Sequence, residues 1–282
     1  THSPVPLFLP TRGRKVVTVC DLFFVEHPEL ADAEARRDFS KRVGRAVARA
    51  DGVITISEYS RRAILERLGG VRGEVRAVPL GVDPSFFDSP SADLLEDLRR
   101  RLELPSRFAL FVGAFEPRKN LPRLVEAWKE VRGRVPDAVL VLAGRRGGDS
   151  RRVEDGVRRL GLEAGVRMIG YVAQEDLPGL YRLASLFILP SLCEGFGLPV
   201  LEAMAAGLPA AVSSTSALPE VAGDAALYFD PRRSESIAEA ALRLLEDEPL
   251  RRDLSRRGRE RARLFPWSET ARRTLDFYRS LG

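Results

Sequence analysis

The chain of 282 residues has a net charge of +5, 44% hydrophobic residues and 30% charged residues, the composition of an ordinary globular protein with one or two domains. Two cysteines and two histidines exclude a disulfide framework and are too few for a transition-metal site, so we expect a cytoplasmic protein without a bound metal. The mildly basic charge permits an anionic ligand, a membrane surface or a nucleic acid.

Residues 1–83 carry the pattern of a small and incomplete α/β domain. Short apolar runs predict strands at 15–20, 52–56 and 75–80. The segments between them predict helices at 36–50 and 58–68. Ser57 is placed to cap the second helix. Three strands make a thin sheet, and Thr1 is not a start methionine. We therefore expect that the first part of this domain is missing or that another chain completes it.

Residues 84–106 have the composition of a linker with one helix at 94–104, and a larger domain follows at 107–265. Its predicted strands lie at 108–113, 138–143, 166–169, 186–189, 209–213 and 225–229. Single strands that alternate with helices indicate parallel βαβ units, and hence a doubly wound α/β sheet. Residues 266–282 are predicted as a closing helix.

The first candidate binding segment is FVGAFEPRKN, residues 111–120, at the end of a predicted strand. Asn120 is the sole asparagine of the chain, and we expect it to cap the next helix, with Pro122 in the first turn. Arg118 and Lys119 would then lie at the carboxyl edge of the sheet, where two cations beside a helix N-terminus suit a phosphate. The alternative is a solvated turn with an ordinary helix cap.

The second segment is EGFGLPVLE, residues 194–202, between a predicted strand and a helix. Its glycines would let the backbone approach a ligand, and its two glutamates would face one cleft. Ionised carboxylates accept hydrogen bonds from neighbouring sugar or ribose hydroxyls. The alternative is a helix-start acid followed by a surface glutamate. The candidate ligand contacts here are Glu194, Gly195, Phe196, Gly197, Leu198 and Glu202.

The third segment follows the strand predicted at 166–169. Gly170 would expose backbone to a planar base, and Tyr171 or Val172 could pack on that base. A simple turn at the end of a strand fits the same residues equally well.

Together these segments resemble the retaining GT-B glycosyltransferases of family 4. The matching pieces, spread over residues 15–282, are the two-glutamate motif at 194–202, FVGAFEPRKN, GYVAQEDLPGLY, SSTSALPEVAGDAAL, VITISEYS, VPLGVD and PWSETARRTLDFY. The resemblance implies two Rossmann-like doubly wound domains: an incomplete acceptor-side domain at 1–83 and a nucleotide-sugar-binding domain at 107–265. It also implies that the helix at 266–282 crosses back to the first domain. The most similar subgroup includes mannosyltransferases that use GDP-mannose.

The resemblance also implies roles for single residues. Glu194 would contact hydroxyls of the donor sugar, and Glu202 would bind the ribose. Arg118 and Lys119 would hold the diphosphate and stabilise the charge of the leaving group. Further donor-binding residues would be Gly113, Tyr171 and Val172. The expected reaction moves a hexose, with mannose as the best guess, from a GDP- or UDP-linked sugar to a glycan or lipid-linked acceptor, without a cofactor or a metal.

The sequence departs from the family pattern at two places. Cys20 and Asp21, the acceptor-side candidates, stand where family members often have His-Asp. A thiol does not replace imidazole as a proton carrier, so acceptor-side chemistry is open. Ala114 follows Gly113 where many relatives have arginine, so Arg118 would supply the second positive charge alone.

Three other functions stay open. A donor-binding but inactive module would explain Cys20, and a GT-B sugar-nucleotide epimerase would use the same paired acids and diphosphate site. A different class of function is contact with anionic lipid at the inner membrane face through the arginine-rich face of helix 36–50, although such a face is usually just solvated. The sequence has no aromatic platform or motif for RNA or DNA, so we expect no nucleic-acid partner.

Overall fold

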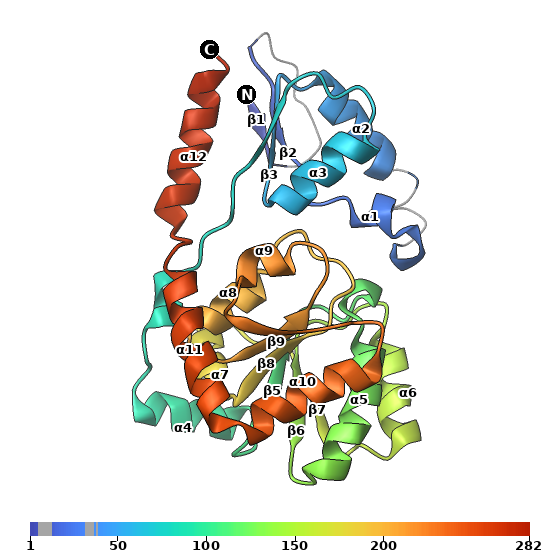
Figure 1. Cartoon of the computed structure of the whole chain (residues 1–282), viewed down its shortest axis with the longest axis vertical. Coiled ribbons are helices and arrows are strands. Elements are labelled where there is room, and N and C mark those ends of the chain that lie inside the picture. Colours follow the sequence, from blue (N-terminus) through green and yellow to red (C-terminus); the bar gives the residue numbers. More distant parts are fainter. Residues whose placement is uncertain (5–12, 32–36, 38) are drawn as a thin grey trace. The chain divides into compact units, whose positions relative to one another are not determined.

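The computed structural model describes residues 1–4, 13–31, 37 and 39–282; the start predicted for the first helix, Arg36, lies outside this part. The chain forms two compact units (Figure 1). The first comprises Thr1–Gly81, Cys193–Gly197 and Phe265–Gly282, and the second comprises Val82–Leu192 and Leu198–Leu264. Residues 84–106, predicted as a linker, belong to the second unit and contribute η3 (Pro84–Phe87) and α4 (Ala92–Arg101).

The first unit contains a parallel sheet with strand order β1-β2-β3-β4. Its strands are β1 (His2–Ser3), β2 (Val16–Thr18), β3 (Gly52–Thr55) and β4 (Glu74–Ala77). Its helices in this part of the chain are α1 (Phe23–Glu26), η1 (Pro28–Leu30), α2 (Ser40–Arg49) and α3 (Glu58–Arg67). The sequence predicted three strands, and β1 is the addition: two residues are too few to produce a periodic signal.

The sheet of the first unit buries both of its faces, because successive strand residues point to opposite sides. On one side Val17 and Val53 join a core with Val43 and Val47 of α2. Ser57 caps α3 as predicted, since its side chain accepts a hydrogen bond from the Ser60 amide at 3.0 Å. Phe39, just before α2, is 40% exposed, and its ring packs edge-on against the buried ring of Phe24.

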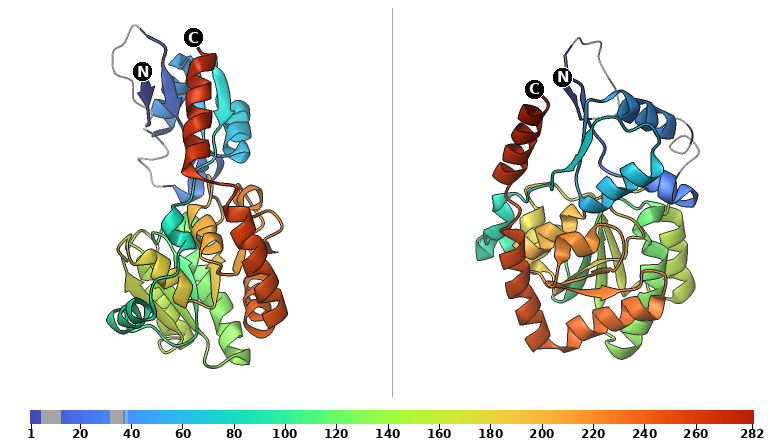
Figure 2. Two further views of the ribbon diagram at one scale, coloured as in Figure 1. Left: turned by 90° about the vertical axis from the view of Figure 1, so that its left-hand side faces the viewer. Right: turned by 45° about the horizontal axis from the view of Figure 1, so that its top comes forward.

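On the other side of this sheet lies α12 (Trp267–Ser280), the last helix of the chain (Figures 1 and 2). The fully buried ring of Phe277 packs there with Val16, Ile54 and Val78. A Cβ atom on Gly52 would lie 2.7 Å from this ring, so the glycine makes room for the helix. The closing helix is therefore part of the core of the first unit.

The second unit contains a six-stranded parallel sheet with order β10-β9-β8-β5-β6-β7. Its strands are β5 (Phe108–Val112), β6 (Val139–Ala143), β7 (Val166–Gly170), β8 (Leu186–Leu189), β9 (Ala210–Ser213) and β10 (Ala226–Phe229). All six strands predicted in this domain are confirmed. The chain adds β6 and β7 on one side of β5 and then returns to add β8, β9 and β10 on the other. The strand order thus reverses between β5 and β8, which is the switch point of a doubly wound sheet.

Two layers of helices cover this sheet (Figure 2). One layer is formed by α5 (Leu121–Arg134), α6 (Ser150–Leu160) and α10 (Ser234–Glu246), in which α5 contacts both of the other helices. The other contains α4, α7 (Leu177–Leu183), α8 (Leu198–Ala205), α9 (Leu218–Ala222) and α11 (Glu248–Ala262). The central strands are consequently buried on both faces, and Leu110, Val141 and Ile188 have no exposed surface. In the described part of the chain, none of the helices has both the length and the apolar character needed to span a membrane.

Candidate functional site

The loop after β5 places two cations at the switch point of the second sheet. It contains η4 (Pro117–Lys119), and the carbonyl of Arg118 accepts a hydrogen bond from the Leu192 amide of the loop after β8 at 2.8 Å. Lys119 is only 6% exposed, and its Cε would lie 3.5 Å from a Cβ atom on Gly113. Arg118 also pairs with Glu116, Nε to carboxylate, at 2.9 Å. The loops of adjacent strands therefore hold both cations at the carboxyl edge, where ligands of such sheets bind.

Asn120 begins α5 as predicted, but its side chain does not cap the helix. Its backbone is left-handed, with φ 58° and ψ 32°, a conformation that asparagine tolerates better than most residues. The side-chain amide donates instead to the carbonyls of Pro190 at 3.1 Å and Pro231 at 2.7 Å, which follow β8 and β10. The sole asparagine of the chain thus connects the loops after β5, β8 and β10, with Lys119 next to it.

Three of the sequence-predicted donor residues line one pocket of about 210 Å³: Gly113, Tyr171 and Val172. Tyr171 is 63% exposed, with the Arg145 guanidinium 5.0 Å from the centre of its ring. Val172 is buried and adds apolar surface. A pocket with apolar walls and one exposed aromatic ring is suited to a planar ring system. Gly170, considered for the same role, has φ +74° and lies outside the pocket lining.

Gly144, which the sequence reading did not single out, shapes this pocket. A Cβ atom there would lie 1.9 Å from the carbonyl oxygen of Gly113, so no other residue fits without moving one of the two loops. The Gly144 amide also donates to the Gly170 carbonyl at 2.7 Å. Its position immediately after the buried strand β6 is the only signal that the sequence offered.

Glu202 lies in α8, is 8% exposed, and accepts a hydrogen bond from the hydroxyl of Tyr181 at 2.8 Å. Burial raises the pKa of Glu202 to about 7, and the Tyr181 hydrogen bond opposes that rise. The alternative of a surface glutamate is therefore wrong. Tyr181 ends the GYVAQEDLPGLY segment, but without the fold nothing indicated that it reaches Glu202.

The loop between β8 and α8 groups with the first unit from Cys193 to Gly197. We expected Gly195 to give room to a ligand, but a Cβ atom there would lie 2.8 Å from the carbonyl oxygen of Cys20 and 2.9 Å from the Cβ of Asp21. The glycine therefore makes room for the chain after β2. The Ser60 hydroxyl donates to the Gly195 carbonyl at 3.4 Å.

The other residues of this loop differ in how far they are buried and in their backbone conformation. Phe196 is 3% exposed and packs edge-on against Phe265, so its ring contributes to a core rather than to an open surface. Gly197 has φ +104°, which glycine adopts without strain. Glu194 is 6% exposed, and Leu198 is partly buried at the start of α8. A buried acid and a buried ring show that this loop is a fixed part of the structure.

A family model described as glycosyl transferases group 1 matches residues 96–261. The chain is 33% identical to O-antigen chain mannosyltransferase B of Escherichia coli, over 99% of this chain and 74% of that protein. The chain belongs to the group 1 glycosyltransferases. It is also 31% identical to mannosylfructose-phosphate synthase of Agrobacterium fabrum and 30% identical to serotype-specific mannosyltransferase WbdA of E. coli. It spans 58% and 34% of the lengths of these two relatives.

Solved structures place this glycosyltransferase in the GT-B fold class. Sucrose-phosphate synthase from Thermosynechococcus elongatus is similar with a TM-score of 0.80 and 30% identity, over 95% of this chain and 68% of that one. HepE from Anabaena, in complex with UDP and glucose, has a TM-score of 0.81 and 22% identity, over 95% and 72% of the two chains. The fold predicted from the resemblance is confirmed.

The acceptor-side candidates of this glycosyltransferase follow β2 in the first unit. Asp21 accepts a hydrogen bond from the Phe23 amide at 3.3 Å. Desolvation, together with the charge of Asp21, raises the pKa of the Cys20 thiol. Cys20 is therefore a neutral thiol at physiological pH and does not take the place of a basic imidazole.

A buried polar group near these residues was not anticipated. The Tyr59 hydroxyl donates to Oε1 of Glu26 at 3.0 Å, and within the described residues the buried Oε2 of Glu26 has no hydrogen-bond partner. Burial, with the charges of Glu26, Asp21 and Glu194, raises the pKa of the Cys193 thiol to about 12. Cys193 is thus a packed, unreactive thiol. Across the residues that the structure describes, no group of three or more His, Cys, Asp or Glu side chains could hold a metal ion.

Proposed function

We propose that this glycosyltransferase moves a hexose, in the first instance mannose, from a nucleoside diphosphate sugar to a glycan or lipid-linked acceptor, with retention of the anomeric configuration. The observation that carries the proposal is the 33% identity with O-antigen chain mannosyltransferase B over 99% of this chain. The names of WbdA and mannosylfructose-phosphate synthase support mannose. The complex of HepE with UDP and glucose supports a nucleoside diphosphate donor, linked to GDP or UDP.

In this proposal the second unit would bind the base, the ribose and the diphosphate of the donor. The base would lie in the pocket of Gly113, Tyr171 and Val172, against apolar side chains. Glu202, oriented by Tyr181, would accept hydrogen bonds from the ribose hydroxyls. The ribose needs the ionised carboxylate for two such bonds, so a donor would favour the deprotonated form of Glu202.

Catalysis would be mainly electrostatic. As the bond from the sugar to the diphosphate breaks, negative charge grows on the leaving diphosphate, and fixed cations stabilise that charge more than they stabilise the ground state. Lys119 is suited to this role because it is buried and because a backbone hydrogen bond connects its loop, after β5, with the loop after β8. Arg118 would supply the second charge, and Glu194 would bind hydroxyls of the sugar. No cofactor or metal enters this proposal.

A matched pair of lysine variants tests donor binding. Lys119→Met removes the buried charge at the switch point, and Lys129→Met removes an exposed charge from α5, the helix that starts beside it. Calorimetric titration with GDP-mannose and UDP-glucose should reveal micromolar to millimolar binding by the unaltered chain. We expect at least tenfold weaker binding for Lys119→Met and less than twofold change for Lys129→Met. Equal affinities in all three proteins would overturn the donor site.

The second candidate function is a donor-binding module without transferase activity, and the neutral Cys20 thiol favours it. The two candidates share the donor site and differ in turnover. Release of GDP or UDP from the bound sugar nucleotide, dependent on an added glycan or lipid-linked acceptor, supports transfer. Tight donor binding without acceptor-dependent release supports the module, and release of a free sugar epimer without any acceptor would indicate an epimerase.

A further inference from the structure

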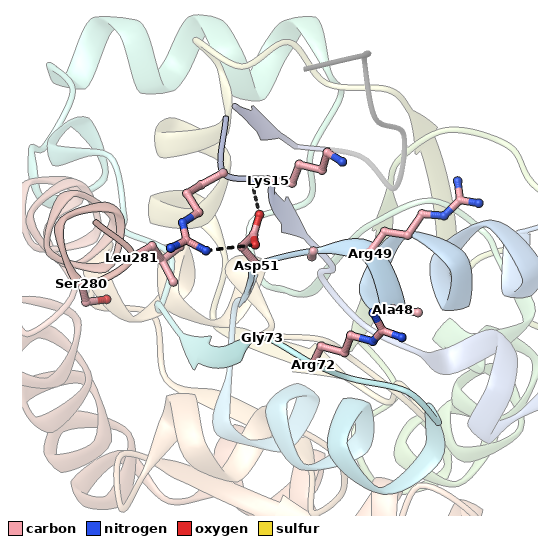
Figure 3. A pocket seen from close by; sticks show the side chains of 10 residues that line it. Lys15, Ala48, Arg49, Asp51, Arg72, Gly73, Ser280 and Leu281 are labelled. Atoms are coloured by element: carbon pink, nitrogen blue, oxygen red, sulfur yellow. Dashed lines mark hydrogen bonds and ion pairs between the residues drawn. The ribbon is translucent and has the colours of Figure 1, made fainter. Parts of the chain in front are cut away.

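A basic pocket of about 790 Å³ lies at the amino ends of β2, β3 and β4 in the first unit (Figure 3). Cys20 and Asp21 follow the carboxyl end of β2, so the pocket is at the opposite edge of this sheet from the acceptor-side candidates. Its lining consists of Arg14, Lys15, Ala48, Arg49, Ala50, Asp51, Arg72, Gly73, Ser280 and Leu281. No part of the donor site described above enters it.

The lining carries four cations and one carboxylate. The carboxylate, Asp51, is already engaged, because it accepts hydrogen bonds from the Lys15 amide at 2.7 Å and from Arg14 at 3.4 Å. Among the residues that the structure describes, the side chains of Lys15, Arg49 and Arg72 form no ion pair with a carboxylate. The pocket therefore keeps an excess of positive charge that the surrounding described residues do not neutralise.

Three separate segments bring these cations together. Lys15 precedes β2, Arg49 ends α2, and Arg72 precedes β4. In Figure 3 the three side chains extend to the same side of the pocket. A Cβ atom on Gly73 would lie 2.3 Å from the carbonyl oxygen of Asp51, so only glycine allows the segment of Arg72 to approach the segment of Arg49 this closely.

We propose that this pocket binds an anion that carries phosphate groups. Guanidinium groups match the geometry of phosphate oxygens, and several cations favour a ligand with more than one negative charge over a single carboxylate. None of the ten lining residues is aromatic, so the pocket offers no stacking surface for a nucleobase. Its volume is in the range of small-molecule sites. The helix ends at Ala50 and Leu281 expose carbonyls rather than amides, so side chains must provide the binding.

The ligand can be a soluble phosphate compound or a lipid headgroup, and the test has an arm for each. For the soluble arm, inorganic pyrophosphate is added to ¹⁵N-labelled protein at low ionic strength, and the amide signals of Asp51, Gly52 and Gly73 are followed by NMR. These signals report on this pocket alone, so binding of pyrophosphate beside Lys119 does not obscure the result, and the inference can fail while the donor site stands.

The decisive comparison is between two double variants of equal charge. Arg49→Gln/Arg72→Gln removes two cations from the pocket, and Arg62→Gln/Arg67→Gln removes two exposed cations from α3 of the same unit. We expect saturable shifts with pyrophosphate in the unaltered protein and in the α3 variant. We expect binding at least tenfold weaker in the pocket variant, whose folded state the remaining amide signals verify.

In the lipid arm, the same three proteins are sedimented with vesicles of phosphatidylcholine with and without phosphatidylglycerol. Sedimentation that needs phosphatidylglycerol and is lost only in the pocket variant identifies a headgroup as the ligand. Pyrophosphate binding without such sedimentation identifies a soluble ligand. If neither probe binds, the inference is wrong. It is also wrong if both double variants lose binding equally, because diffuse surface charge then explains the binding.

Discussion

At the scale of single residues, Glu202 connects the chemistry of the donor site with the stability of the protein. Burial raises its pKa from the ordinary value of 4.5 to about 7, so between these values the folded state holds a proton that the unfolded state has released. A group of this kind stabilises the fold at low pH, and the stabilisation is lost as the pH rises toward the folded pKa. The carboxylate that a ribose would use is thus an unfavourable charge in the ligand-free protein.

Replacement of Glu202 by glutamine should remove this pH dependence. We compare the free energy of unfolding of Glu202→Gln with that of the unaltered chain. We expect the difference, variant minus unaltered chain, to increase by about 2 kcal/mol from pH 5 to pH 8. Urea denaturation at the two pH values measures the difference, with the exposed Glu130→Gln of α5 as the control. If the difference in unfolding free energy between Glu202→Gln and the unaltered chain is the same at both pH values, Glu202 ionises as easily in the folded state as in the unfolded state.

At the scale of elements, the loops after β5 and β6 pack against each other where Gly144 lies next to the carbonyl oxygen of Gly113. We expect Gly144→Ala to lower the free energy of unfolding by about 2–3 kcal/mol and to weaken nucleotide binding, because the added methyl group meets the Gly113 carbonyl. Gly133→Ala is the matched control: this glycine lies in α5 with no atom near its Cβ position, so the change should stabilise the helix by about 0.5–1 kcal/mol. Thermal melts with and without GDP test both. A neutral Gly144→Ala would show that the loops can separate freely.

The strands of both sheets, apart from the two-residue β1, could be predicted because a parallel strand is a short apolar run between turn residues. The roles of single residues could not be predicted with the same success. Asn120 was placed correctly at the start of a helix, yet its amide binds carbonyls 70 and 111 residues away, which no local pattern encodes. Gly195 has the composition of a ligand loop, but the space beside it holds the backbone of Cys20. A glycine in the sequence can indicate that another group lies close to its backbone, but only the fold shows whether that group is a ligand or another part of the chain.

At the scale of the whole molecule, the chain leaves the first unit at Gly81, contributes the short loop Cys193–Gly197 to it, and returns to it at Phe265. The helix that returns supplies the ring of Phe277, on which Val16, Ile54 and Val78 pack. The core of the first unit is therefore completed by a helix that lies far along the chain from its strands.

Truncation of this ring should destabilise one unit selectively. We expect Phe277→Ala to lower the stability of the first unit by about 3–5 kcal/mol, because a fully buried ring leaves a cavity. Leu275→Ala, on the same helix at a position 46% exposed, should have little effect. Amide hydrogen exchange would detect faster exchange in β2 and β3 with unchanged exchange in β5 and β6. Equal acceleration in all four strands would contradict the assignment of Phe277 to the first core.

Residues 193–197 are covalently flanked by β8 and α8, yet they group with the first unit. Anyone who builds hybrids of two related transferases by joining their halves near residue 82 would therefore pair Gly195 with a foreign counterpart of Cys20 and Asp21. A workable exchange has four junctions rather than one, near residues 82, 193, 198 and 265. It transfers residues 193–197 and α12 together with residues 1–81, so that Gly195 keeps the Cys20 and Asp21 against which it packs.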